Sequence, residues 1–205
     1  ISRIDQTTGS MKYKNIALFC GSAEGNNPVY AQQAREFGIR LAEKNLTLYY
    51  GGGCIGLMWA TAEEVMNHGG TVIGVAPDFF TRNHVLAENI TKMIYVKTMS
   101  ERKQLLEYEA DAFVALPGGY GTMDELFEIL TDSQLGMHTK PIVLFNQNGF
   151  YDPLVAQLER FSEEGFLRPF HKKLLMVANT IDEIFECLDT YENTNDPNWL
   201  KHIRH

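Results

Sequence analysis

Short apolar runs alternate along this chain with longer amphipathic stretches. The apolar runs cover residues 15–21, 46–52, 71–77, 93–96, 112–118 and 141–146. Their near-continuous apolar character is typical of strands that are covered on both faces of a parallel sheet. Apolar residues at helical spacing occupy residues 27–45, 56–70, 100–111, 122–136, 151–166 and 180–191. The alternation predicts an α/β fold, with one domain built on a doubly wound, Rossmann-like and mostly parallel sheet that carries helices on both faces.

The chain divides into three parts by composition. We interpret residues 1–10 as a remnant placed ahead of a natural start at Met11, residues 11–190 as the folded domain, and residues 191–205 as a polar C-terminal tail. Within the domain, residues 78–92 have no clear periodicity. This segment is a candidate loop over a binding site.

Composition and charge narrow the possible partners. A net charge of −8 argues against sequence-independent binding to nucleic acid or to an acidic membrane. No apolar run approaches the about 20 residues that a membrane-spanning helix needs. Cys20, Cys54 and Cys187 have no metal-ligand spacing, and their odd number and wide separation favour reduced thiols in a cytoplasmic protein.

Three predicted strands end in glycine-rich turns, at residues 20–28, 50–58 and 116–125. Ligands of open α/β sheets bind outside the carboxyl ends of the strands, and all three turns should lie there. A single glycine turn is explained equally well by tight chain reversal. Three such turns, with Ser22 and Thr122 at helix starts, favour a phosphate-bearing ligand. The G-x-G-x-x-G pattern of residues 51–56 is weak because it follows the second strand instead of the first, and no P-loop is present.

Two cations lie where a helix dipole disfavours them. Thr98 and Glu101 match a capping box, which predicts a helix start near residue 98. Arg102 and Lys103 then fall in the first or second turn, where positive charge is unfavourable. For Lys103, a solvated pair with Glu107 and a functional role are equally good explanations. For Arg102 we favour function, because a guanidinium there can bind phosphate or carboxylate through two hydrogen bonds.

A second capping box, formed by Thr122 and Glu125, follows the third glycine turn. It places Asp124 and Glu125 in the first turn of a helix, and we expect both to help cap it. Glu125 should also stand beside a bound anion and near Arg102. A carboxylate in that position can orient a water molecule or a ribose hydroxyl.

The motifs "SERK" (100–103) and "PGGYGTMDE" (117–125) together closely resemble the signature of the LOG family, the cytokinin-activating phosphoribohydrolases. The similarity extends from about Ile16 to Leu188. It implies that residues 11–190 are a nucleotide-binding catalytic domain that hydrolyses the N-glycosidic bond of an adenine-type nucleoside 5′-monophosphate. The substrate would be AMP or an N6-modified AMP, and the products would be free base and ribose 5-phosphate. The resemblance also implies a homodimer that uses no metal and no organic cofactor.

The resemblance assigns roles to individual positions. Arg102 and Glu125 correspond to the catalytic pair, and whether Arg102 binds phosphate or orients Glu125 stays open. An oxocarbenium-like ribose would be stabilised by the carboxylate. The glycine turns and the resemblance together predict a substrate-binding set of Ser22, Gly53, Met99, Arg102, Lys103, Gly118, Gly119, Tyr120, Gly121, Thr122, Asp124 and Thr131.

Some positions depart from the family pattern. Trp59 replaces a glycine, and we expect it to fill core space, the alternative being that it narrows the base pocket. Either His84 or Glu88 takes the place of a substrate-contacting glutamate, so the identity of the base stays open.

The alternative function is a non-catalytic nucleotide-binding or sensing protein on the same fold. We disfavour an amino-acid decarboxylase, since no lysine context for pyridoxal phosphate is recognisable. A dinucleotide dehydrogenase is equally disfavoured, because the chain has no convincing second domain.

Overall fold

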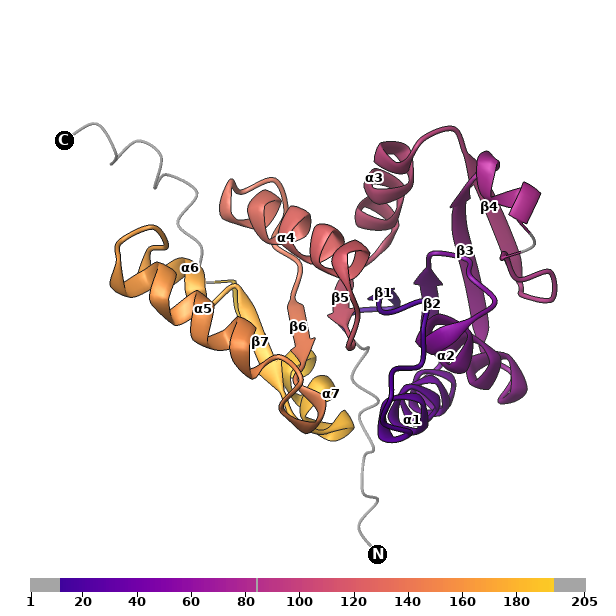
Figure 1. The fold of residues 1–205 in the computed structure, drawn as a ribbon, viewed down its shortest axis with the longest axis horizontal. Helices are drawn as coiled ribbons and strands as arrows, with labels where there is room; N and C mark the ends of the chain where they lie inside the picture. The colour runs from indigo at the N-terminus through magenta and orange to yellow at the C-terminus, as the bar shows by residue number, and fades with distance from the viewer. Residues whose placement is uncertain (1–11, 84, 194–205) are drawn as a thin grey trace, which may run out of the picture.

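The computed structural model describes residues 12–83 and 85–193, with the backbone alone for residues 82 and 83. Their strands form one seven-stranded sheet in the order β4-β3-β2-β1-β5-β6-β7, and every neighbouring pair is parallel (Figure 1). The predicted doubly wound α/β fold is therefore confirmed. The strands are β1 (Asn15–Phe19), β2 (Thr47–Tyr50), β3 (Thr71–Pro77), β4 (Lys92–Val96), β5 (Ala112–Ala115), β6 (Ile142–Phe145) and β7 (Leu175–Ala178).

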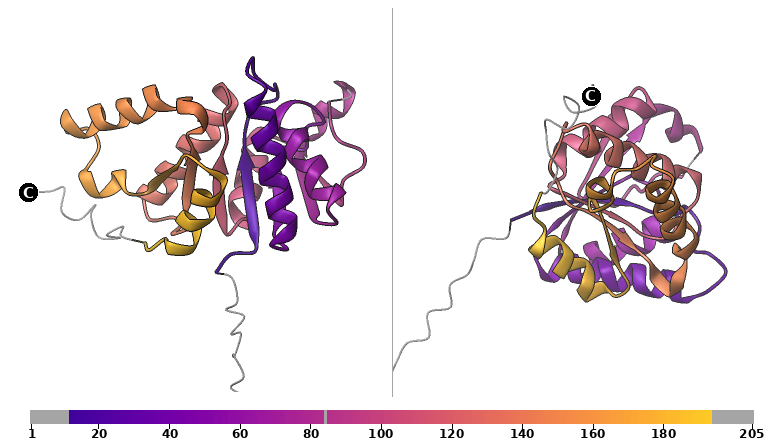
Figure 2. Two further views of the ribbon diagram at one scale, coloured as in Figure 1. Left: turned by 90° about the horizontal axis from the view of Figure 1, so that it is seen from below. Right: turned by 90° about the vertical axis from the view of Figure 1, so that its left-hand side faces the viewer.

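Helices cover both faces of the sheet (Figure 2). One core cluster joins the sheet to α1, α2 and α7, and a second joins it to α3, α4 and α5. Both faces of the central strands are therefore dry, which explains their near-continuous apolar sequence. The helices are α1 (Val29–Glu43), α2 (Gly56–Asn67), α3 (Met99–Glu109), α4 (Tyr120–Gln134), α5 (Asp152–Glu163), α6 (Pro169–Lys172) and α7 (Ile181–Thr190), with 3₁₀ turns η1 (Asp78–Asn83) and η2 (Gln147–Gly149). Within the described ranges, none of these helices combines the length and the apolar character that crossing a membrane requires.

The strand order reverses at β1, which pairs with β2 on one side and with β5 on the other. This reversal is the topological switch point, where the chain leaves a crevice at the carboxyl edge of a doubly wound sheet. Phe19 and Ala115 are paired at the ends of β1 and β5, so the loops that follow start side by side. Backbone hydrogen bonds continue the pairing from Leu116 N to Phe19 O at 2.9 Å and from Gly21 N to Pro117 O at 3.0 Å.

The six predicted strands are all present, but β7 was not predicted. Its four residues lie at the edge of the sheet and are mostly half-buried or exposed. The run "LLMVA" (174–178) is the sequence signal, and it is short because an edge strand needs less apolar surface. Residues 1–10 and all of the tail beyond residue 193 lie outside the described residues.

Candidate active site

A cavity of about 460 Å³ lies at the carboxyl ends of β1, β2 and β5. Its volume falls in the range of about 300–1,000 Å³ that is usual for small-molecule sites. The three glycine turns, the start of α3 and the segment between β3 and β4 form its walls. The lining residues are Leu18, Cys20, Gly21, Ser22, Gly51, Gly53, Ile55, Met58, Phe80, Val85, Leu86, Met99, Arg102, Gly119, Tyr120, Gly121, Thr122, Asp124 and Glu125.

The start of α3 is determined by local hydrogen bonds. Thr98 is the N-cap, and its hydroxyl accepts from Glu101 N at 3.1 Å. The Glu101 carboxylate accepts in turn from Lys97 N at 2.8 Å. The predicted cap is confirmed, and it places Arg102 at the end of the first turn, on the side of the helix that faces the sheet.

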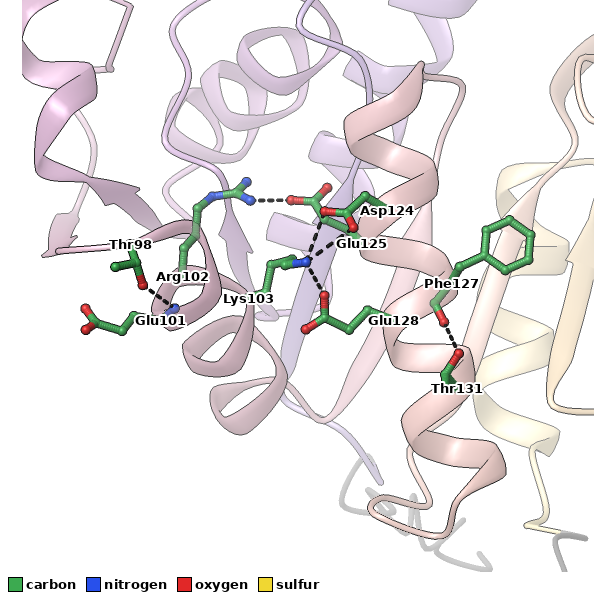
Figure 3. Close-up of polar contacts among 9 residues, drawn as sticks. All are labelled: Thr98, Glu101, Arg102, Lys103, Asp124, Glu125, Phe127, Glu128 and Thr131. Carbon is green, nitrogen blue, oxygen red and sulfur yellow. Dashed lines mark hydrogen bonds and ion pairs between the residues drawn. The ribbon is translucent and has the colours of Figure 1, made fainter.

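Arg102 is a buried cation, with 8% of its surface exposed. Its Nε donates to the carbonyl of Val75 at the end of β3, at 3.1 Å, and its Nη1 donates to Glu125 Oε1 (Figure 3). A Cβ at Gly51 would overlap the guanidinium. Glycine at this position therefore makes room for the arginine at the end of β2.

The start of α4 differs from the sequence prediction. Gly119 is the N-cap, no side chain caps the helix, and the first turn holds no acidic residue. The predicted Thr122–Glu125 capping box is wrong, because the N-cap is Gly119, three residues before Thr122. Asp124 and Glu125 consequently lie in the second turn and do not cap. The backbone N–H groups of the first turn have no partner within the helix and stay available to an anion.

Glu125 is as buried as its partner, with 8% exposed. Burial raises the pKa of Glu125 above its ordinary value, and the Arg102 guanidinium opposes that rise. The pair places one carboxylate, held by one cation, on the wall of the cavity (Figure 3). Such a carboxylate can stabilise developing positive charge and can accept a proton from water.

Cys20 also lines this cavity, but it has a different chemical state. Burial raises the pKa of the Cys20 thiol, and the neighbouring carboxylate of Glu125 adds to the rise. A thiol in these surroundings stays protonated at neutral pH, whereas the thiolate is the nucleophile. Cys20 therefore lines the cavity as a neutral thiol and not as a nucleophile.

The glycines of the β5–α4 loop (residues 116–119) and of the first turn of α4 have two distinct roles. A Cβ at Gly118 would overlap the Thr122 hydroxyl and lie 2.9 Å from Gly21 N. At Gly119 and Gly121 an added Cβ would meet no protein atom within 4 Å. Packing thus requires Gly118, whereas Gly119 and Gly121 face open space on the cavity side.

Not every predicted substrate-binding residue reaches this cavity. Lys103 points to α4, where Nζ lies 3.1 Å from Asp124 Oδ2 and pairs with Glu128 (Figure 3). These partners raise the pKa of Lys103, with Glu128 contributing most. Pairing with Glu107, one of the two explanations considered for Lys103, is replaced by this contact between α3 and α4.

Thr131 lies near the far end of α4 and donates its hydroxyl to Phe127 O at 2.7 Å (Figure 3). It borders two other depressions instead of the cavity. The structure therefore places Lys103, Thr131 and Gly118 outside the cavity lining of this chain. Ser22, Gly53, Met99, Tyr120 and Asp124 lie within it, beside Arg102, Gly119, Gly121, Thr122 and Glu125.

Sequence reasoning missed the apolar part of the cavity wall. Its side chains come from the second glycine turn and from residues 78–87, and they are Ile55, Met58, Phe80, Val85 and Leu86. Two backbone hydrogen bonds of 2.8 Å, Cys54 N to Val85 O and Ala87 N to Gly52 O, attach this segment to the glycine turn. The predicted loop over the site is confirmed, although its side chains could not be assigned from sequence.

Of the positions that depart from the family pattern, Trp59 packs against the core and does not line the cavity. This agrees with the expectation that it fills core space. Glu88 is exposed and lies outside the lining set, and His84 lies outside the described residues. Within the described ranges, no group of three or more His, Cys, Asp or Glu side chains is arranged to hold a metal ion.

Fold and site together define a Rossmann-like α/β protein with an open helix N-terminus beside a buried arginine–glutamate pair. The family model described as "Possible lysine decarboxylase" matches residues 58–188. The chain belongs to this family, which includes the LOG proteins.

Curated relatives agree over most of the chain. It is 38% identical over 185 residues to the cytokinin riboside 5′-monophosphate phosphoribohydrolase LOG2 of Arabidopsis thaliana, covering 90% of this chain and 87% of the relative. It is 40% identical over 180 residues to LOG1 of the same plant, which is named for the same activity. That alignment covers 88% of this chain and 84% of LOG1.

Similar solved structures support only the fold, because their sequence identity to this chain is low. The molybdenum cofactor binding protein of Rippkaea orientalis has a TM-score of 0.65 at 21% identity, over 86% of this chain and 96% of that one. The molybdenum cofactor carrier protein of Chlamydomonas reinhardtii has a TM-score of 0.63 at 20% identity, over 87% of this chain and 99% of that one.

Proposed function

We propose that this chain hydrolyses the N-glycosidic bond of an adenine-type nucleoside 5′-monophosphate. The substrate is AMP or an N6-modified AMP of the cytokinin type, and the products are free base and ribose 5-phosphate. One observation carries the proposal: the buried carboxylate of Glu125, held by Arg102, lines a nucleotide-sized cavity beside an uncapped helix N-terminus. The activity for which the relatives at 38–40% identity are named supports it.

The 5′-phosphate is assigned to the start of α4. Backbone N–H groups and the helix dipole attract an anion there, and Gly119 and Gly121 leave space for its close approach. Among the residues whose side chains the structure describes, the charged ones that line the cavity are Arg102, Asp124 and Glu125, and the one cation of this set is already paired. Backbone donors therefore carry most of the phosphate binding.

The chemistry assigned to Glu125 follows from the charge that develops on the sugar. As the bond from C1′ to the base nitrogen breaks, its electron pair leaves with the base and positive charge builds on the ribose. The carboxylate stabilises that charge and accepts a proton as water adds to C1′. The departing base takes a proton from solvent water and Glu125 returns its proton to solvent, so that one water is consumed and the carboxylate is restored. Phosphate binding at α4 supplies remote binding energy that favours the transition state.

Arg102 is assigned to orienting Glu125. Its Nε is occupied by Val75 O and its Nη1 by the carboxylate, which places it between the sheet and α4. It also opposes the rise in the pKa of Glu125 and thus keeps more of the carboxylate ionised at neutral pH.

The test of this function is the appearance of free base. Purified protein is incubated with AMP and with N6-isopentenyl-AMP, and base and ribose 5-phosphate are quantified by chromatography. The matching nucleosides, which lack the phosphate, serve as control substrates and are expected to react much more slowly. Binding of both nucleotides in calorimetry without release of base would instead support the non-catalytic nucleotide-binding alternative.

Alanine at two neighbouring glycines is expected to separate packing from ligand binding. Gly118→Ala should lower the free energy of unfolding by about 1–3 kcal/mol, because its Cβ overlaps Thr122. Gly119→Ala should cost less, about 0.5–1 kcal/mol, because the site is open and only the preference of the N-cap for glycine over alanine is lost. It should nevertheless weaken AMP binding by about tenfold or more, which equals about 1.4 kcal/mol. Thermal unfolding and calorimetric titration measure both quantities, and unchanged affinity in Gly119→Ala would move the phosphate elsewhere.

We further propose that the chain is a cytoplasmic homodimer. Besides the family resemblance, a groove of about 420 Å³ between α4, α5 and α6 is lined mainly by apolar side chains, and Phe166 at its rim is 86% exposed. Monomeric proteins rarely leave large apolar patches uncovered. Light scattering during gel filtration should give twice the chain mass of 23.3 kDa. A monomer mass at micromolar concentration would contradict this proposal.

A further inference from the structure

The β5–α4 loop is held by contacts on two sides. On the β1 side, Leu116 N and Pro117 O make the backbone hydrogen bonds to Phe19 and Gly21 described above. On the opposite side, the hydroxyl of Tyr151 donates to Leu116 O at 2.8 Å. The backbone of Gly118 lies beside the same phenol. The Tyr151 phenol thus forms a bridge from the segment after β6 to the β5–α4 loop.

The position of Tyr151 is itself strongly determined. Tyr151 is 3% exposed and lies between η2 and α5, 35 residues beyond Leu116 in sequence. Its backbone N–H donates to Asn146 Oδ1 at 2.7 Å, and Asn146 Nδ2 donates to Asp152 Oδ1 at 2.7 Å. These bonds fix the backbone of Tyr151 in the segment that follows β6, and its phenol is therefore held in place against the loop.

The bridge decides which N–H groups can meet a ligand. Gly118 packs against Thr122 and lies two residues beyond Leu116, whose carbonyl accepts from Tyr151. Gly119 and the first turn of α4 are the next groups along the chain, and they face the cavity. Donors that bind an anion must keep their geometry, because a displacement of about 1 Å can cost about 10²-fold in rate.

We propose that Tyr151 is a positioning residue: its hydroxyl holds the β5–α4 loop so that the backbone donors of Gly119 and of the first turn of α4 converge on the 5′-phosphate. The inference rests on the proposed function for the identity of the ligand. Tyr151 does not line the cavity, so it acts through the loop and contacts no substrate.

The experiment compares two substitutions that each remove one buried hydroxyl. Tyr151→Phe removes the bridge. Tyr13→Phe is the matched control, because Tyr13 is 4% exposed and its hydroxyl donates to Asp189 Oδ1 at 2.8 Å, near the amino end of β1. Both variants lose one hydrogen bond of similar geometry, so a purely structural role predicts similar effects.

Three readouts are expected to distinguish them. Tyr151→Phe should raise KM for AMP and weaken inhibition by ribose 5-phosphate, each by about tenfold or more, with a smaller change in kcat. Its rate with the corresponding nucleoside should stay within about twofold of the wild type, because no phosphate is bound there. Hydrogen exchange of the amides of residues 116–122 should become faster. Tyr13→Phe should change none of these.

The outcomes separate this inference from the proposed function. If Tyr151→Phe and Tyr13→Phe bind ribose 5-phosphate equally well and exchange equally at residues 116–122, the positioning role is wrong. If the wild type releases no base, the hydrolase proposal fails, whereas binding of ribose 5-phosphate and the exchange rates still decide the role of Tyr151. An equal loss of kcat for nucleotide and nucleoside would also overturn the assignment to the phosphate.

Discussion

Glu125→Gln is expected to lower kcat for AMP hydrolysis by about 10²–10⁴-fold and to leave AMP binding within a few-fold of the wild type. Glutamine keeps the shape of the side chain and can still contact Arg102. It cannot carry the negative charge that stabilises the ribose in the transition state. Single-turnover release of base, measured beside calorimetric binding of AMP, checks both parts of this expectation.

Two further substitutions sharpen that result. Glu125→Asp retains the charge but withdraws it by one methylene, so activity between those of the wild type and Glu125→Gln is expected. Glu159 lies on α5 and forms an exposed ion pair with Lys172 of α6. Glu159→Gln therefore controls for the loss of a carboxylate elsewhere, and it should leave kcat unchanged. Wild-type turnover in Glu125→Gln would exclude Glu125 from the chemistry.

The raised pKa of Glu125 has a consequence for the pH profile. The carboxylate is the form assigned to catalysis, so activity should fall on acidification at a pH above the ordinary range of a glutamate. The acid limb should be absent from the residual activity of Glu125→Gln.

Arg102→Met is expected to reduce the free energy of unfolding by about 3–5 kcal/mol at neutral pH, because it leaves the Glu125 carboxylate buried without its cation. Activity should fall with it, as the carboxylate loses its orientation. The double variant Arg102→Met with Glu125→Gln removes the unpaired charge. It should recover part of the stability but none of the activity. Denaturant unfolding of the wild type, both single variants and the double variant measures the coupling between the two side chains.

The stability of Arg102→Met should also depend on pH in a defined direction. Removing the guanidinium removes its charge and its hydrogen bond, the two largest effects that lower the pKa of Glu125, so burial raises that pKa further. A carboxyl group with a raised pKa in the folded state stabilises that state below its unfolded pKa, and this contribution is lost as pH rises through the folded value. The wild type loses its own smaller contribution in the same way, because its Glu125 pKa is also raised. The deficit relative to the wild type should therefore grow above the folded pKa of Glu125 in the wild type and level off above the higher value in the variant. A deficit that is constant with pH, or is the same in the double variant, would contradict the buried-charge explanation.

Much of this site was predictable because its parts are local. The Thr98–Glu101 cap depends on residues three apart, and it placed Arg102 correctly. The glycine turns follow predicted strands, and parallel strands bring their carboxyl ends to one edge. That reasoning brought Arg102 and Glu125 to the same edge of the sheet, where the structure makes them a pair.

The errors arose where local patterns had two solutions. Thr122 and Glu125 have the spacing of a capping box, but Gly119 starts α4 earlier and Glu125 turns to a cation from another helix. Lys103 had a possible partner on its own helix in Glu107, and the packing of α3 against α4 brought Asp124 and Glu128 closer. No one-dimensional pattern ranks a partner on the same helix against one across an interface.

The α/β alternation, the three glycine turns, the start of α3 and the family of the chain could all be read from the amino-acid sequence. These depend on periodicity and on short motifs, which are properties of neighbouring residues. The packing of strands and helices was needed to establish that Arg102 neutralises Glu125, that Gly51 makes room for Arg102, and that Tyr151 reaches the β5–α4 loop. These contacts join residues about 20 to 50 apart, and their existence depends on strand order and helix packing, which bring distant side chains within a few ångströms.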